Sequence, residues 1–128
     1  MAIRIIKLGS RREPGEGVRI GTVRRPPRGV PKTDFAKRDF YEVWLPILSP
    51  TPELLKEGRA SRDEASWAVF KKRFRSEVNG GEPGKVLDLL AALSHQTNMS
   101  LGCYCEDEKT CHRSVLRELL IERGANLA

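Results

Sequence analysis

Short apolar runs separated by turn residues predict three strands. Residues 3–8 and 18–23 are rich in isoleucine, valine and leucine, and a glycine borders each run, which is typical of strands. Residues 101–105 form a third apolar run before a polar turn. Residues 40–48 alternate aromatic and aliphatic side chains, but serine and proline follow at once, so we expect only a short extended or irregular segment there.

Capping residues and apolar residues at three- and four-residue steps together predict four helices. Residues 53–57 follow Thr51 as N-cap, and Gly58 ends this short helix. Ser61 and Glu64 then have the spacing of a capping box, with the serine as N-cap of a longer helix. The apolar stripe behind this box consists of Trp67, Phe70, Phe74 and Val78.

Two further helices complete the pattern. Pro83 opens the first, and the second covers residues 111–123 and ends at Gly124. The order strand, strand, loop, three helices, strand, helix predicts an α/β fold. We expect a single layered domain over residues 1–128, with a small, largely parallel sheet flanked by helices. The inner face of the helix behind Pro83 consists of Val86, Leu87, Leu90 and Leu93.

Length and composition exclude several classes of protein. No apolar run approaches the ~18–20 residues of a membrane span, and Arg4 and Lys7 interrupt the first apolar run, so we expect neither a membrane protein nor a secretory signal. Cys103, Cys105 and Cys111 are too few and too close together for a disulfide framework. We therefore expect a cytoplasmic protein, and the sequence leaves its oligomeric state open.

The charge is unevenly distributed. The formal net charge is +6, but residues 1–40 contain 11 basic and 4 acidic side chains, whereas residues 41–128 contain 12 and 13. All the positive excess therefore lies in the first third. This favours an anionic partner, which could be nucleic acid, phosphate or a small acid. A solvated basic surface is the alternative.

The segment 102–113 carries the most chemistry. It joins the end of a strand to the start of a helix, where ligands bind in open α/β sheets, and four free amides at the helix start would favour an anion. The same field would lower the pKa of Cys111, and Arg113 could form a forked pair with phosphate or carboxylate. The candidate catalytic residues are Cys111 and His112, and the candidate ligand-binding residues here are Cys105, Glu106 and Arg113.

Each of these residues also has a structural interpretation. Cys103 could be a small buried thiol that shares one strand face with Cys105. His112 lies on the apolar stripe of the last helix and could be a buried histidine bonded to the preceding strand or loop. Arg113 could be plain surface, and Glu106 could belong to a solvated acidic turn.

The loop 24–32 is the second candidate element. Its three prolines prevent regular structure. If the second predicted strand lies parallel to the third, both strands end at the same edge of the sheet. The loop would then face the same pocket as His112 and Arg113, where a small anionic molecule could bind. The candidate ligand-binding residues of the loop are Arg24, Arg28 and Lys32.

Three thiols and an imidazole within ten residues raise the alternative of a zinc site or a redox-sensing thiol cluster. The spacing Cys-x-Cys-x5-Cys-His matches neither paired Cys-x2-Cys knuckles nor a Cys2His2 finger. Adjacent residues of a helix point about 100° apart, so Cys111 and His112 are not expected to hold one ion. We therefore assign no metal ligand and leave the cofactor open.

Four motifs carry a family resemblance. They are the loop Arg24-Arg25-Pro26-Pro27-Arg28-Gly29, the segment from Trp44 to Pro50, the pair Trp67 and Phe70, and the ending Cys103-Tyr104-Cys105-Glu106 with Cys111-His112-Arg113. Together they resemble domain-of-unknown-function family 488, in its short, YeaO-like branch. Many relatives have an aspartate where this chain has Val23 and a tryptophan where it has Pro26. The resemblance implies an α/β fold and the position of a site, and it brings no established reaction.

Three classes of function are consistent with the sequence. The first, a domain or enzyme that binds a small anion, is favoured because polar groups converge where the fold binds ligands. The second is a nucleic-acid-binding domain that uses the basic first third and whose binding would weaken steeply with salt. The third is the zinc or thiol cluster. In the first class, replacing Arg28 or Arg113 with alanine is expected to weaken the binding of an anion such as sulfate or phosphate and to leave thermal stability nearly unchanged.

Overall fold

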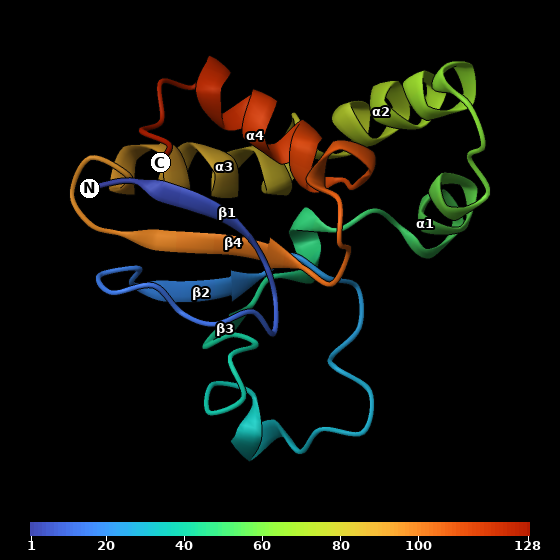
Figure 1. The fold of residues 1–128 in the computed structure, drawn as a ribbon. Coiled ribbons are helices and arrows are strands. Elements are labelled where there is room, and N and C mark those ends of the chain that lie inside the picture. The colour runs from blue at the N-terminus through green and yellow to red at the C-terminus, as the bar shows by residue number, and fades with distance from the viewer.

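The sheet has four strands, all parallel, in the order β1-β4-β2-β3 (Figure 1). In this computed structural model, which describes residues 1–128, β4 pairs with both β1 and β2. The predicted α/β fold with a largely parallel sheet is therefore confirmed. The strands are β1 (Ile3–Lys7), β2 (Val18–Gly21), β3 (Val43–Trp44) and β4 (Met99–Cys103).

The central strand β4 begins and ends two residues before its predicted position. All five of its residues are buried, and its last residue, Cys103, pairs with Lys7 of β1. Cys105 therefore lies beyond the strand and is exposed, so the two cysteines do not share a strand face. The segment 40–48 contributes the short edge strand β3, in agreement with the expected short extended segment.

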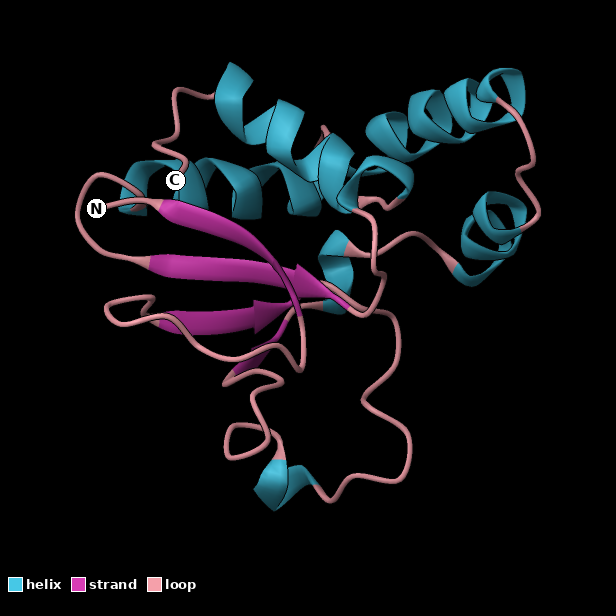
Figure 2. Cartoon of the chain, viewed as in Figure 1, coloured by secondary structure: helices cyan, strands magenta, loops and turns pink.

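Figure 1 shows α3 and α4 beside the sheet, while α1 and α2 extend past the ends of the strands. Figure 2 shows the long loop between β2 and β3 on the side away from the helices. Side chains of α3 and α4 form one hydrophobic core with Ile20 and Leu101 of the strands. No helix combines the length and the apolar composition that crossing a membrane requires. The helices are α1 (Pro52–Arg59), α2 (Glu64–Val78), α3 (Gly81–Leu93) and α4 (Arg113–Glu122).

Two helix ends differ from the prediction for local reasons. The N-cap of α2 is Asp63 and not Ser61, because the Asp63 carboxylate accepts a hydrogen bond from the Ser66 amide (2.8 Å) and the Ser66 side chain completes the capping box. Gly58 does not end α1, which continues for another residue. A Cβ atom at Gly58 would lie 2.7 Å from the Phe70 ring, so the glycine allows α1 to approach α2.

The third helix also begins earlier than predicted. α3 starts at Gly81, and Pro83 occupies its first turn, where a missing amide proton breaks no helical hydrogen bond. The predicted inner position Leu93 is wrong, because its side chain is 37% exposed and Ala91 is buried instead. The predicted inner residues that are fully buried are Leu87 and Leu90.

A buried ion pair ties the loops beneath the sheet to β2. Arg19 donates to the carboxylate of Glu16 and to the carbonyl oxygens of Ser10 (2.8 Å) and Asp39 (2.6 Å). Burial by itself raises the pKa of Glu16, but hydrogen bonds from Arg19 and from the Glu13 amide outweigh it and lower the pKa to about 2. The ionised form of Glu16 therefore stabilises the folded chain.

Replacing Glu16 with glutamine tests this ion pair. The pKa of Glu16 is about 4.5 when unfolded and about 2 when folded, so its contribution is complete above pH 4.5 and lost as the pH falls toward 2. This corresponds to roughly 3 kcal/mol at neutral pH. Urea unfolding should show Glu16→Gln less stable than wild type by this amount at pH 7 and by only about 1 kcal/mol at pH 2.5. The exposed control Glu13→Gln should behave as wild type, and a pH-independent difference for Glu16→Gln would contradict the assignment.

Candidate functional site

The carboxyl ends of β2 and β4 open into one cavity of about 630 Å³. Because these strands are adjacent and parallel, the loop after β2 and the turn after β4 leave the sheet at the same edge. The predicted convergence of the two segments is confirmed, since Arg24 and Arg28 line the same cavity as His112. The three cysteines, Cys103, Cys105 and Cys111, line it as well.

The arginines of this cavity fall into two groups. Arg24 donates to the carbonyl oxygens of Ser49 and Pro50, both at 3.0 Å, and so holds the loop against the segment that precedes α1. Three exposed arginines line the cavity with no side-chain hydrogen bond or ion pair, and their guanidinium groups are available to a ligand. They are Arg25, Arg28 and Arg59.

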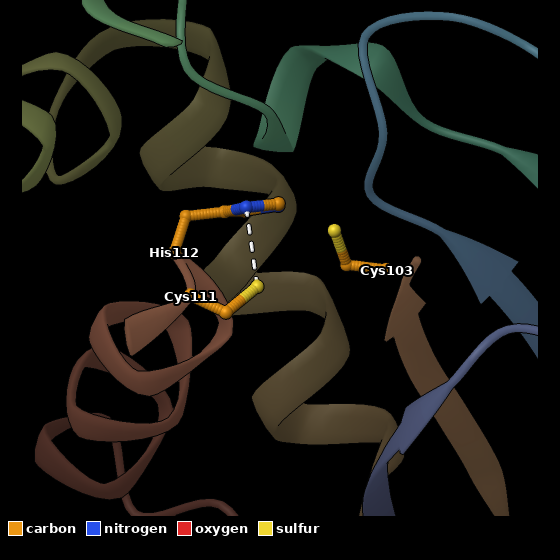
Figure 3. Close-up of side chains that lie close together, drawn as sticks. All are labelled: Cys103, Cys111 and His112. Atoms are coloured by element: carbon orange, nitrogen blue, oxygen red, sulfur yellow. Dashed lines mark hydrogen bonds between the residues drawn. The ribbon is translucent and has the colours of Figure 1, made fainter. Parts of the chain in front are cut away.

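Cys111 and His112 face each other. The sequence predicts that they diverge on a helix, and this is wrong because Cys111 precedes α4 and has an extended backbone (φ −122°, ψ 152°). The Sγ atom of Cys111 lies 3.7 Å from Nδ1 of His112. Figure 3 shows both side chains directed toward Cys103, which ends β4. The helical angle of about 100° therefore does not apply to this pair.

The tautomer of His112 follows from its partner Thr22, the residue after β2. Its Nε2 atom lies 2.7 Å from the carbonyl oxygen of Thr22, which can only accept a hydrogen bond, so Nε2 carries the proton. In the neutral ring, Nδ1 then has a free lone pair that faces Cys111. The Thr22 hydroxyl donates to the carbonyl oxygen of Gly102 (2.9 Å). His112 is thus a buried histidine bonded to a strand end, and it also lines the cavity.

Cys111 is the cysteine whose thiolate is favoured. Hydrogen bonds from the thiols of Cys103 and Cys105 lower the pKa of Cys111, and together with His112 they outweigh its burial. Hydrogen bonds to Cys105 and Cys111, with burial, raise the pKa of Cys103. The Nε–H group of Arg113 also donates to Cys111 Sγ at 3.3 Å. Negative charge in this cluster is therefore stabilised on Cys111.

Arg113 is buried, contrary to the surface interpretation. Its guanidinium donates to the carbonyl oxygens of Ile6 and Cys105, which ties the end of β1 to the turn after β4. It does not line the cavity.

The start of α4 does not offer the four free amides expected from the sequence. The amides of Ser114 and Val115 donate to the carbonyl oxygens of Cys111 (3.0 Å) and His112 (3.1 Å). These bonds between residues three apart tighten the first turn of α4 and use two of its amides within the helix.

Besides Arg113, two more of the predicted ligand-binding residues lie outside the cavity lining. Lys32 is exposed in a short 3₁₀ turn, Lys32–Asp34, and Glu106 forms an ion pair with Lys7. Of the predicted loop and turn residues, those that line the cavity are Arg24, Arg28, Cys105, Cys111 and His112.

A family model described as the Active DUF488-N3 subclade matches residues 3–124. The chain belongs to the DUF488 family. The match includes both the loop after β2 and the Cys-His-Arg turn, so the resemblance seen in the sequence is confirmed. Searches of the curated proteins and of the solved structures found no match. Membership of the family establishes no ligand and no reaction.

The cavity of this DUF488 member also contains residues that its sequence did not single out as ligand-facing. Trp67 and Phe70, assigned to a core stripe, line the cavity with their rings stacked at 4.8 Å. Phe40 and Tyr104 line it as an edge-to-face pair at 6.2 Å. A stripe at helical spacing looks the same whether it faces a core or a cavity. Arg59 was missed because α1 extends past its predicted end.

The buried contacts of Arg113 replace the expectation that its loss leaves stability nearly unchanged, and alanine substitutions should distinguish it from the exposed Arg28. Arg113→Ala leaves two carbonyl oxygens without their donor, so we expect unfolding free energy to fall by about 2–4 kcal/mol. Arg28→Ala removes an exposed side chain that has no partner, and it should change the unfolding free energy by no more than about 0.5 kcal/mol. Urea titration of both variants at neutral pH measures this. Equal effects would show that the assigned contacts of Arg113 do not stabilise the fold.

Proposed function

We propose that this DUF488 member binds a small anionic ligand, a phosphate, carboxylate or nucleotide, in the cavity at the carboxyl edge of its sheet, and that Cys111 and His112 act on it. The observation that carries this proposal is that three arginines without partners share one cavity with the thiol–imidazole pair. The arginines are Arg25, Arg28 and Arg59.

The charge of the cavity supports an anion. A guanidinium group without an acidic partner has its N–H donors free, and their forked arrangement matches the oxygen atoms of phosphate and carboxylate. No glutamate or aspartate lines the cavity, so an anionic ligand would meet no like charge there. The volume of about 630 Å³ lies in the range of small-molecule sites.

The thiol–imidazole pair supports chemistry on the bound ligand. Nδ1 of His112 can accept a proton from Cys111 or from the ligand, while its Nε2–H group remains bonded to Thr22. The Cys111 sulfur would act as nucleophile, and the nearby guanidinium groups would stabilise the negative charge that develops. These roles suit an enzyme of the group-transfer or hydrolytic type.

Binding of inorganic phosphate and of a nucleoside monophosphate tests the proposal. Calorimetry should detect both ligands with wild type, and Arg25→Ala and Arg28→Ala should each raise Kd about tenfold, the value of one charge-assisted hydrogen bond. The matched control is Arg38→Ala, because Arg38 is exposed, lies outside the cavity and has no side-chain partner.

Three results would contradict the proposal. The first is a lack of binding at millimolar ligand. The second is an equal loss in Arg38→Ala, which would indicate an effect of overall charge. The third is tight binding of generic DNA or RNA that falls steeply with salt and depends equally on all three arginines, which would favour a nucleic-acid-binding role instead.

A further inference from the structure

We propose that Cys103, Cys111 and His112 bind a zinc ion, in a three-ligand site whose fourth position opens into the arginine-lined cavity. One ligand atom from each of these buried residues lies within 4.8 Å of the other two. They come from the end of β4 and from the turn before α4, and Figure 3 shows the three side chains converging. These three ligands are brought together by the tertiary fold, and their spacing in the sequence matches no common zinc motif.

The distances fit a tetrahedral ion. Sulfur and nitrogen ligands bound about 2.0–2.3 Å from zinc at tetrahedral corners lie roughly 3.3–3.8 Å from one another. Cys111 Sγ and His112 Nδ1 are 3.7 Å apart. Cys103 Sγ, within 4.8 Å of both, needs to move by about 1 Å, which a small side-chain rotation supplies.

The neighbours of the cluster are those that a metal site requires. Histidine ligands usually donate their other ring N–H to a carbonyl or carboxylate, which orients the free lone pair toward the ion. His112 does this through Nε2 to the Thr22 carbonyl, so Nδ1 faces the cluster. Arg113 donates to Cys111 Sγ at 3.3 Å and would stabilise the coordinating thiolate. Two thiolates also neutralise a divalent cation, which reduces the cost of burying it.

The fourth position faces the cavity. All three residues line the cavity, and open sites with three protein ligands are typical of catalytic zinc. Cys105 is exposed, and its Sγ atom lies 3.8 Å from Sγ of Cys103. It does not belong to the group of three residues whose ligand atoms all lie within 4.8 Å of one another. We therefore assign the fourth position to water or the bound anion. With zinc bound, Cys111 and His112 would be ligands and not nucleophile and proton acceptor, so this inference keeps the anion-binding site of the proposed function and replaces those two roles.

Cobalt spectroscopy of the reduced, metal-free full chain tests this inference. One Co²⁺ per chain should produce the thiolate charge-transfer band and the intense visible bands of a tetrahedral site, and Zn²⁺ should abolish both by displacement. Cys103→Ser and Cys111→Ser should each weaken zinc binding by at least about 100-fold, more than loss of an outer-shell partner. The matched control Cys105→Ser should keep the bands.

If a ligand variant fails to fold, the wild-type spectrum by itself still tests whether the chain has a tetrahedral thiolate site. No cobalt bands, or bands without thiolate character, would overturn the site. Loss of the bands in Cys105→Ser would overturn the open fourth position. Arg28→Ala should bind cobalt as wild type does, so loss of phosphate binding with intact cobalt bands contradicts only the proposed function. Phosphate binding without cobalt binding contradicts only the metal site.

Discussion

The parallel pairing of β2 with β4 is the constraint on which the site depends. It brings two segments about 80 residues apart to one edge of the sheet, where Thr22 follows β2 and Gly102 stands next to the end of β4. Gly21 pairs with Gly102, and neither has room for a side chain: a Cβ atom would lie 2.4 Å from Tyr41 or 2.5 Å from Leu8, respectively. The two glycines therefore leave room for Tyr41 and Leu8 to pack directly against the backbone of β2 and β4.

The three consecutive residues Cys111, His112 and Arg113 have different structural tasks because the backbone changes conformation between them. Cys111 is extended, whereas α4 begins two residues later. This change turns the thiol toward the imidazole, leaves His112 bonded to Thr22, and directs Arg113 across the turn to Ile6. The turn after β4 is thereby fastened to both neighbouring strands. A rigid attachment of this kind keeps reactive groups in a defined geometry.

The basic excess of the first third is only partly available to a ligand. The guanidinium of Arg19 is buried and bonded to Glu16 and to loop carbonyl oxygens, so it cannot contact a ligand. The guanidinium of Arg24 is bonded to the segment before α1 and holds the loop after β2 in place. Other cations of this region, such as Arg12, are paired with acidic side chains. Arg25 and Arg28 remain without partners at the cavity. The net charge of a segment therefore overestimates its capacity to bind anions, because ionic contacts within the fold use part of it.

Periodicity and turn residues determined the order of elements, the α/β class and the two segments that meet at the cavity, because these signals act over a few neighbouring residues. Strand direction could be stated only as a condition, since pairing between β2 and β4 depends on contacts far apart in the chain. The tertiary structure alone decided that Cys111 and His112 converge, that Arg113 is buried, and that Arg59 reaches the cavity. The reason is physical: the direction of a side chain depends on the local backbone torsions, and its burial depends on which distant segments pack over it.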